Sequence, residues 1–273
     1  RRVRGLVNAV LRRVAASPAP DWPDDATRLS YPDWIVERLV ADLGPAAAVA
    51  ALEEMDRPAA VTRRADGYVQ DLASQLVADA VGAAPGERGA DLCAAPGGKA
   101  TRLAWHHPAL VAAADVRPSR VAMVAANAAR LGCGEVAAVA ADGRRPPFAA
   151  GAFDRVLLDA PCSGLGVLRR RADARWRVTP GDVDRLAAIQ RALLGSAATL
   201  VRPGGILVYS VCTLTAAETV GVDEWAAGAL AGFEAPAPLA EDGWEPVGRG
   251  SRLLPQTLGT DGMYLLRLRN GPR

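Results

Sequence analysis

Reactive and polar side chains follow several short apolar segments of this 273-residue sequence. Asp159 and Cys162 lie in the loop after one such segment, and Cys212 ends the next. A cysteine is an effective nucleophile when it is partly exposed and its pKa is lowered. Cysteines at segment ends beside polar residues fit this use, whereas Cys133 is typical of core packing. The sequence therefore predicts thiol chemistry carried by Cys162 and Cys212.

A glycine turn and two acidic residues predict a nucleoside pocket. The turn follows an apolar segment and comprises Cys93, Ala94, Ala95, Pro96, Gly97, Gly98 and Lys99. Its glycines let the backbone approach a ligand closely. Asp115 ends the next apolar segment, where a carboxylate accepts ribose hydroxyls, and Arg120 could orient it. Asp142 could receive an adenine amino group. Taken singly, each acid is more typical of a cap or turn. Because no phosphate cradle is present, S-adenosylmethionine fits better than a dinucleotide.

From about residue 67 onward, apolar segments alternate with helical stretches. The expected strands are 90–93, 109–116, 136–141, 153–159 and 205–212, and the helices lie near 98–105, 118–131 and 182–201. This alternation predicts a parallel α/β sheet with helices on both faces. Residues 263–269 predict a further strand, antiparallel at or near an edge. Ligands of such sheets bind beyond the carboxyl ends of the strands, where the polar groups above are expected to gather.

The residues before 67 predict helices. Residues 1–14 form an amphipathic pattern with a basic face, suited to packing on a partner domain or to contacting nucleic acid. Residues 32–55 read as two short helices with a break at Gly44 and Pro45. We therefore expect a helix over 1–17, a helical linker or truncated subdomain over 18–66, and a catalytic domain over 67–273.

Composition excludes several classes of protein. The 32 Lys and Arg residues nearly balance the 30 Asp and Glu residues, which argues against a uniformly basic coat. The 4 cysteines contain no CxxC pair, so neither a disulfide framework nor a metal site is expected. No apolar run of about 18 residues and no signal peptide are found, which predicts a cytoplasmic protein with no membrane association. The chain begins at Arg1 without Met, as a fragment of a longer protein would.

Two features of the cations are informative. Lys99 is the single lysine of the chain; either a compact ammonium is needed there and arginine would not serve, or the lone lysine is chance. Between Gly166 and Arg177 the sequence carries five arginines, one aspartate and one tryptophan. Arg169 and Arg170 are predicted to bind RNA phosphates and Trp176 to stack on a base, although a solvated loop would look the same.

Three of these segments resemble the signature blocks of a known family. Residues 91–99, 159–164 and 209–212 are similar to those of the RsmB/Nop2/Sun family of RNA cytosine-5 methyltransferases, and the chain looks like its bacterial RsmB (Sun/Fmu) members. Further similar positions are 69–71, 74, 166–170, 173, 176 and 259–263. The resemblance covers roughly 67–269. It implies a class I methyltransferase fold, Rossmann-like, with a mostly parallel seven-stranded sheet, and S-adenosylmethionine as the cofactor.

The resemblance also implies residue roles. The loop 93–99 with Asp115, Asp142 and Asp159 would bind the cofactor, helped by Arg120 at the ribose. Cys212 would add to carbon 6 of cytosine, and Cys162 would assist the breakdown of the covalent adduct. Lys99 and Asp159 would line the cytosine pocket. The chemistry is consistent, because thiolate addition makes carbon 5 nucleophilic and an acid at ring nitrogen 3 stabilises the developing charge. The target base must be unstacked, which favours single-stranded or loop RNA.

The chain departs from the family pattern at several places. Val211 and Gln256 stand where threonine and histidine are common. Gly67 follows Asp66 where the family carries some dozens of residues, so a small RNA-facing subdomain is expected to be missing. Residues 5–13 resemble the last helix of a NusB-like RNA-binding domain.

The resemblance implies an RNA cytosine-5 methyltransferase with small-subunit (16S) rRNA as its substrate, and we expect a monomer. The alternatives are a tRNA cytosine-5 methyltransferase of the same family and a catalytically silent RNA-binding or ribosome-assembly factor. Binding alone needs neither Cys162 nor Cys212, so the two cysteines argue against the silent alternative.

Overall fold

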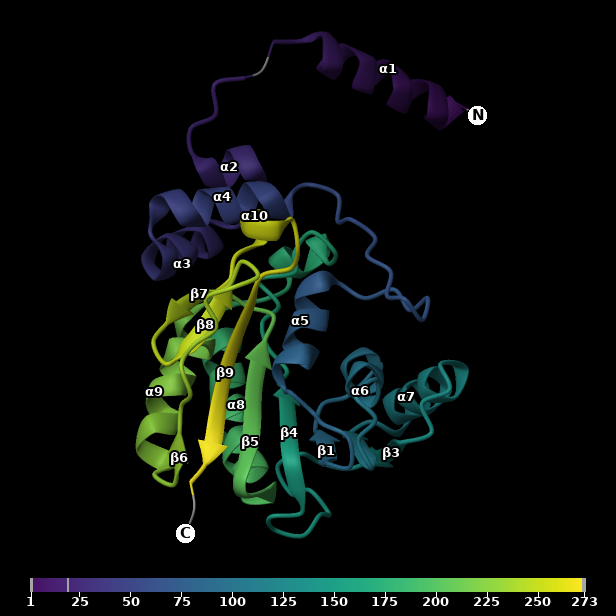
Figure 1. The fold of residues 1–273 in the computed structure, drawn as a ribbon. Helices are drawn as coiled ribbons and strands as arrows, with labels where there is room; N and C mark the ends of the chain where they lie inside the picture. The colour runs from purple at the N-terminus through teal and green to yellow at the C-terminus, as the bar shows by residue number, and fades with distance from the viewer. Residues whose placement is uncertain (1, 19, 272–273) are drawn as a thin grey trace.

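The computed structural model describes residues 2–18 and 20–271 (Figure 1). Its helices are α1 (Arg2–Ala16), α2 (Asp25–Leu29), α3 (Asp33–Leu43), α4 (Pro45–Met55), α5 (Leu72–Ala80), α6 (Gly98–Ala104), α7 (Pro118–Arg130), α8 (Pro180–Leu200), α9 (Val220–Ala229) and α10 (Pro255–Leu258), with 3-10 turns η1 (Ala172–Trp176) and η2 (Ala216–Glu218). Its strands are β1 (Arg88–Asp91), β2 (Leu110–Asp115), β3 (Val136–Ala140), β4 (Phe153–Asp159), β5 (Val201–Val211), β6 (Phe233–Glu234), β7 (Glu245–Val247), β8 (Gly250–Leu253) and β9 (Met263–Asn270).

The strands form one sheet in the order β3-β2-β1-β4-β5-β9-β8-β7, with β6 paired to β9. Strands β1 to β5 are parallel, as predicted, and β9 runs antiparallel to β5. Within the described ranges the sheet has 9 strands rather than the predicted seven, because the short strands β6 and β7 extend its antiparallel side. The predicted tail strand is antiparallel, but β8 covers its outer side.

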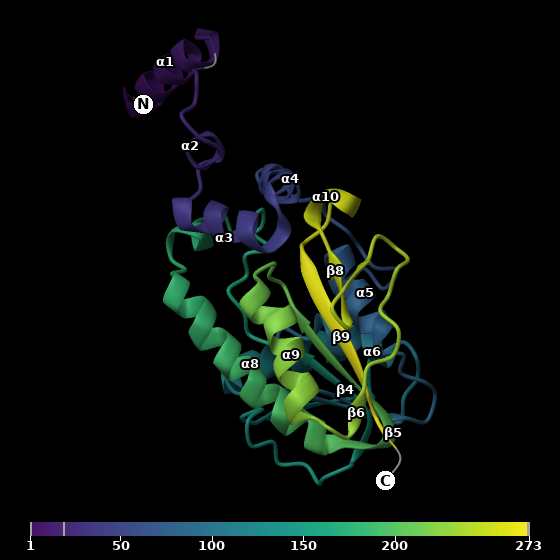
Figure 2. The same ribbon diagram turned by 90° about the vertical axis from the view of Figure 1, so that its left-hand side faces the viewer.

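Helices cover both faces of the sheet. Figure 2 shows α8 and α9 on one side and α5 and α6 on the other. Successive side chains of β4 point to opposite faces of the sheet. Val156 and Leu158 pack against α8 and α9, whereas Leu157 packs against α5, α6 and α7. Because both faces are buried, the parallel strands read as continuous apolar runs. Helix α8 begins at a capping box in which Thr179 and Asp182 satisfy each other's backbone N–H groups.

The N-terminal helices divide into two parts. Helices α2, α3 and α4 bury their apolar side chains, Ile35, Leu39 and Leu52 among them, in one cluster with Leu165 and Leu168 of the loop after β4. The segment 18–66 thus shares a core with the predicted catalytic domain. In contrast, every described side chain of α1 is exposed, and Figures 1 and 2 show α1 standing apart from the rest. No helix of the described residues is long and apolar enough to cross a membrane.

A tight turn connects α4 to the site. Arg63 and Val69 form an isolated antiparallel bridge, and Gly67, at φ +81°, closes the turn by donating its N–H to the carbonyl of Arg64 over 2.9 Å. The fully buried Arg64 side chain then donates to the carbonyl of Gly98 over 2.8 Å. The turn 63–69 is therefore anchored on the predicted cofactor loop through Arg64.

Candidate active site

The two predicted thiols lie in contact at the carboxyl end of the sheet. β4 and β5 are adjacent and in register, with Asp159 opposite Ser210, so the loops that follow them start side by side. The Sγ atoms of Cys162 and Cys212 are 3.3 Å apart, and both cysteines are half-buried. Residues 50 positions apart in the sequence are thus brought together by the sheet, as the pattern of strand ends predicts.

Lys99 and Asp159 form an ion pair in the same region. The Lys99 Nζ lies 2.7 Å from one carboxylate oxygen of Asp159 and 3.5 Å from the hydroxyl of Ser74. The hydroxyl of Ser210 donates to the other oxygen of Asp159 over 2.7 Å. Burial by itself would lower the pKa of Lys99, but the carboxylate of Asp159 outweighs it and raises that pKa. Lys99 is therefore held as an ammonium.

The two thiols differ in their surroundings. The hydrogen bond with Cys212 raises the pKa of Cys162 well above its ordinary value, and burial and the carboxylates of Glu218 and Asp159 act in the same direction. Cys162 therefore keeps its proton and can donate it to the Cys212 sulfur. Lys99 lies close enough to Cys212 that a thiolate there would raise the pKa of Lys99 further.

A cavity of about 190 Å³ opens between the glycine turn and the segment before α5. Its lining includes the predicted residues Cys93, Ala94, Ala95, Pro96, Gly98, Lys99 and Asp159 together with Tyr68, Val69, Gln70, Ser74 and Asp91. Gly97 supports the turn from behind: it has φ +104°, and a Cβ there would lie 3.2 Å from the Cα of Val124. Burial raises the pKa of the Cys93 thiol, so Cys93 lines the cavity as a neutral group.

Asp91 is a site residue to which the sequence analysis gave no role. It ends β1, is 1% exposed and lines the cavity. One of its oxygens accepts the N–H of Cys93 over 3.4 Å, and the other has no partner. Burial, followed by the charge of Asp159, raises the pKa of Asp91 to about 7. Its position before the glycine turn was the available signal, since an acid at a strand end next to a ligand loop points at the ligand.

The predicted ribose and adenine acids end the neighbouring strands. Asp115 is buried at the end of β2, with the Arg120 Nε 3.4 Å from its carboxylate. Arg120 also donates to the carbonyl of Ala95 over 2.9 Å, which links it to the glycine turn. Asp142 is half-exposed and bonded to the guanidinium of Arg144, whose hydrogen bonds lower the pKa of Asp142. None of the three lines the 190 Å³ cavity.

For Arg169 the structure corrects the prediction of a phosphate ligand. Its side chain is 2% exposed and pairs with Asp261 at 3.2 Å and Asp71 at 3.4 Å. Arg170 pairs with the same two carboxylates and its side chain is 31% exposed. Arg169 is therefore neutralised by carboxylates of the same chain and is not available to a phosphate. The sequence showed the cations of this loop, but the carboxylates that neutralise them come from distant segments.

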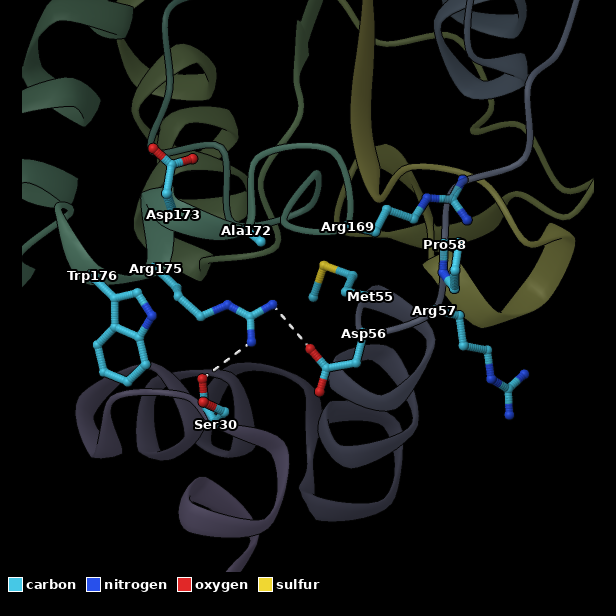
Figure 3. Close-up of a pocket in the computed structure, with 10 residues that line it drawn as sticks. All are labelled: Ser30, Met55, Asp56, Arg57, Pro58, Arg169, Ala172, Asp173, Arg175 and Trp176. Carbon is cyan, nitrogen blue, oxygen red and sulfur yellow. Dashed lines mark hydrogen bonds and ion pairs between the residues drawn. The ribbon is translucent and has the colours of Figure 1, made fainter. Parts of the chain in front are cut away.

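Trp176 lies at a second and larger cavity of about 470 Å³ (Figure 3). The cavity separates the end of α4 from η1, with Trp176 at one end and Arg57 at the other. Arg175 forms one wall; it is buried, stacks 3.8 Å above the ring of Tyr31 and pairs with Asp56 at 2.9 Å. Trp176 is 63% exposed, so its ring is available to a ligand. Within the described ranges no group of His, Cys, Asp and Glu side chains could hold a metal ion.

Comparison with known proteins shows the family of this chain. The family model described as 16S rRNA methyltransferase RsmB/F matches residues 80–269. A Mycobacterium tuberculosis protein, whose name gives it provisionally as a methyltransferase, is 44% identical over 223 residues, 77% of this chain and 47% of that protein. The ribosomal RNA small subunit methyltransferase B of Thermus thermophilus is 39% identical over 246 residues, 80% of this chain and 59% of that protein. The chain thus spans about half the length of these relatives.

A solved structure shares the fold. The crystal structure of NSun6 from Pyrococcus horikoshii with SFG, an analogue of S-adenosylmethionine, superposes with a TM-score of 0.68 and 30% identity, covering 76% of this chain and 53% of that one. The predicted class I methyltransferase fold is thereby confirmed. Since the matched residues 80–269 include the glycine turn and both thiols, the resemblance seen in the sequence is also confirmed, and this chain belongs to the RsmB/F family of 16S rRNA methyltransferases.

Proposed function

We propose that this chain is an RNA cytosine-5 methyltransferase that uses S-adenosylmethionine, forms a covalent bond between Cys212 and cytosine, and acts on 16S rRNA. The contact of 3.3 Å between the Cys162 and Cys212 sulfurs, beside the Lys99–Asp159 pair and the cofactor cavity, carries this proposal. The family and the names of its relatives support rRNA as the substrate. The presence of both thiols supports activity rather than RNA binding alone.

The cavity and the strand ends beside it offer groups suited to S-adenosylmethionine. The partnerless oxygen of Asp91 is a ready acceptor for the ammonium of its methionine part. Asp115, oriented by Arg120, would accept the ribose hydroxyls, and Asp142 the adenine amino group. The glycine turn 93–99 supplies a close-lying backbone. When bound, S-adenosylmethionine supplies a methyl group that its sulfonium makes electrophilic.

The side chains divide the chemistry among them. Cys212 attacks carbon 6 of cytosine, and the electrons of the 5,6 double bond move into the ring. Asp159, held by Lys99 and Ser210, takes a proton from the Lys99 ammonium at 2.7 Å and donates it to ring nitrogen 3, which neutralises that charge. Carbon 5 then takes the methyl group. Loss of the carbon 5 proton to a base restores the double bond and expels the Cys212 thiolate. Cys162, in contact with Cys212 and protonated, assists this last step.

RNA must present an unstacked cytosine to this buried site. Trp176 supports such binding, because its exposed ring beside the 470 Å³ cavity can stack on a neighbouring base. We include Trp176 and the partly exposed Arg170 in the proposed RNA surface.

RNA containing 5-fluorocytidine tests the proposal, because fluorine at carbon 5 blocks release of the adduct. The native enzyme with S-adenosylmethionine should form a complex that survives denaturing electrophoresis, and Cys212→Ala should form none. Cys162→Ala should instead accumulate adduct on ordinary RNA. Folded protein that gives no adduct with rRNA or any other RNA would contradict the proposed chemistry. Bisulfite sequencing of the methylated RNA would then identify the nucleotide.

A further inference from the structure

A buried carboxylate lies directly behind the two thiols. Glu218, at the end of η2, is 0% exposed and forms no ion pair among the described residues. Its carboxylate instead accepts hydrogen bonds from four residues. Ser163 donates its backbone N–H over 2.8 Å and its hydroxyl over 2.5 Å. Thr213, Thr215 and Gln190 donate over 3.2, 2.9 and 3.0 Å. An unpaired buried charge is costly, so such a site is kept only where these bonds offset its desolvation.

The partners of Glu218 are the neighbours of the reactive residues. Ser163 immediately follows Cys162, and Thr213 immediately follows Cys212. The hydroxyl oxygens of Ser163 and Thr213 lie 2.8 Å apart, so Thr213 can direct its one proton either to Ser163 or to Glu218. The Glu218 carboxylate therefore connects the loop after β4 to the end of β5, next to Cys162 and Cys212.

Helix α8 braces the same connection. The amide of Gln190, which is 0% exposed, donates both to Glu218 and to the carbonyl of Pro161, the residue before Cys162. The hydroxyl of Tyr209 in β5 donates to the backbone carbonyl of Glu218 over 2.7 Å and approaches the side-chain oxygen of Gln190 at 3.0 Å. The residues on both sides of Cys162 are thus fixed with reference to Glu218.

We propose that Glu218 is a positioning residue of the active site, whose carboxylate ties the Cys162 loop to the end of β5 and thereby holds the two sulfurs in contact. The catalytic meaning of that contact rests on the proposed function. The carboxylate also favours the protonated form of Cys162, since its charge contributes to the raised pKa of that thiol. Both effects serve a reaction in which Cys212 attacks while Cys162 retains its proton.

Three variants separate position from stability. Glu218→Ala removes the tie, whereas Glu218→Gln keeps its shape and lets the amide donate to one of the hydroxyls. Asp223→Asn is the matched control, because Asp223 is 3% exposed and accepts hydrogen bonds from Arg249 rather than from the cysteine loops. Urea unfolding measures the stability of each variant.

Two readouts follow the thiols. The first is bridging of Cys162 to Cys212 by dibromobimane, mapped by peptide mass and independent of RNA. The second is adduct formation with 5-fluorocytidine RNA. Glu218→Ala should slow bridging clearly and adduct formation about a hundredfold, since small displacements of reacting groups cost that much. Glu218→Gln should stay within about fivefold of the native rates, as expected for one weakened hydrogen bond. Asp223→Asn should leave both rates unchanged.

The outcomes distinguish this proposal from the proposed function. If Glu218→Ala bridges its thiols at the native rate, or if Asp223→Asn slows both readouts equally, the positioning role is overturned. If Glu218→Gln is as slow as Glu218→Ala, the geometric tie is also overturned. If Glu218→Ala slows bridging while the native protein forms no RNA adduct, the positioning role stands and the proposed function fails.

Discussion

Lys99 is singled out both by the composition of the chain and by its position beside Asp159. It is the single lysine among 32 basic residues, and its side chain is 12% exposed between Asp159 and Ser74. The Lys99 ammonium lies 2.7 Å from one carboxylate oxygen of Asp159. A guanidinium in its place would be larger, and its planar N–H groups would point in other directions.

We therefore expect Lys99→Arg to lose most methyl transfer, about a hundredfold, while the affinity for S-adenosylmethionine changes little. Titration calorimetry with S-adenosylmethionine and transfer of labelled methyl to RNA measure the two effects separately. Normal turnover of Lys99→Arg would mean that the single lysine has no chemical significance.

Asp91 predicts how pH affects cofactor binding. Its pKa is about 7 in the fold and 3.8 as the ordinary value. The folded state therefore binds more protons between these values, and the contribution of Asp91 to stability falls as pH rises through that interval. A bound ammonium would favour the carboxylate. Affinity for S-adenosylmethionine should then weaken about tenfold per pH unit below about 7.

Asp91→Asn is the control for that pH effect. It should bind S-adenosylmethionine weakly at all pH values, with a flattened pH profile, and should unfold at higher urea concentration than the native protein at pH 8. Calorimetry from pH 5.5 to 8.5 gives the profile. A native affinity that is constant across this range would argue against an ammonium at Asp91.

At the scale of elements, Arg169 links three segments that are distant in the sequence. It connects the loop after β4 to Asp71, the N-cap of α5, and to Asp261, which lies two residues before β9 begins. Asp71 caps α5 by accepting the N–H of Ala73 over 2.9 Å. Arg169 therefore stabilises the fold around the site, and its charge is neutralised within the protein.

Arg169→Met should cost about 3 kcal/mol or more in the free energy of unfolding, because two buried carboxylates lose a partner. The salt dependence of RNA binding should stay the same. Trp176→Ala is the contrasting variant: its ring is 63% exposed, so RNA affinity should fall with little change in stability. Urea unfolding and RNA titration at several salt concentrations measure both. A flatter salt dependence in Arg169→Met would restore the phosphate-binding interpretation.

At the scale of the whole molecule, the N-terminal helices contribute unequally. Apart from the bonds of Ser17, the residue after the helix, no described hydrogen bond or ion pair joins α1 to the rest of the chain, and Leu6, Val10 and Val14 on its apolar side are exposed. Helices α2 to α4, in contrast, complete a cluster with Leu165, Leu168, Leu214 and Leu254. Leu165, Leu168 and Leu214 lie in the loops that follow Cys162 and Cys212, and Leu254 lies between β8 and α10.

Removal of the chain up to Ser17 should leave the free energy of unfolding within about 0.5 kcal/mol of the native value. Removal up to Asp56 deletes α2, α3 and α4 and should expose Leu165 and Leu168. The protein should then aggregate or unfold, because a contiguous apolar surface is exposed to water. Chemical denaturation and gel filtration of the two truncated forms provide the comparison. A folded, soluble protein lacking residues up to Asp56 would show that the cluster is dispensable.

The α/β class and the position of the candidate site follow from local residue patterns. Apolar runs alternating with helices require a parallel sheet, and the carboxyl ends of parallel strands share one edge, so Cys162, Cys212, Asp159 and the glycine turn had to gather there. The short elements were harder: α9, the β7–β8 hairpin and α5 lack a long periodic pattern, so local spacing did not predict them.

Which charged and polar groups pair depends on how the chain packs in three dimensions. Arg169 and Asp71 are 98 positions apart, and Ser163 and Glu218 are 55 apart. Pairings over such separations depend on how loops cross at the sheet edge, which local residue patterns do not specify. For the same reason the sequence could show an arginine-rich loop but not its neutralisation, and two cysteines but not the carboxylate that ties their loops. Burial likewise decided that Asp91 keeps one oxygen without a partner, since exposure is a property of the packed chain.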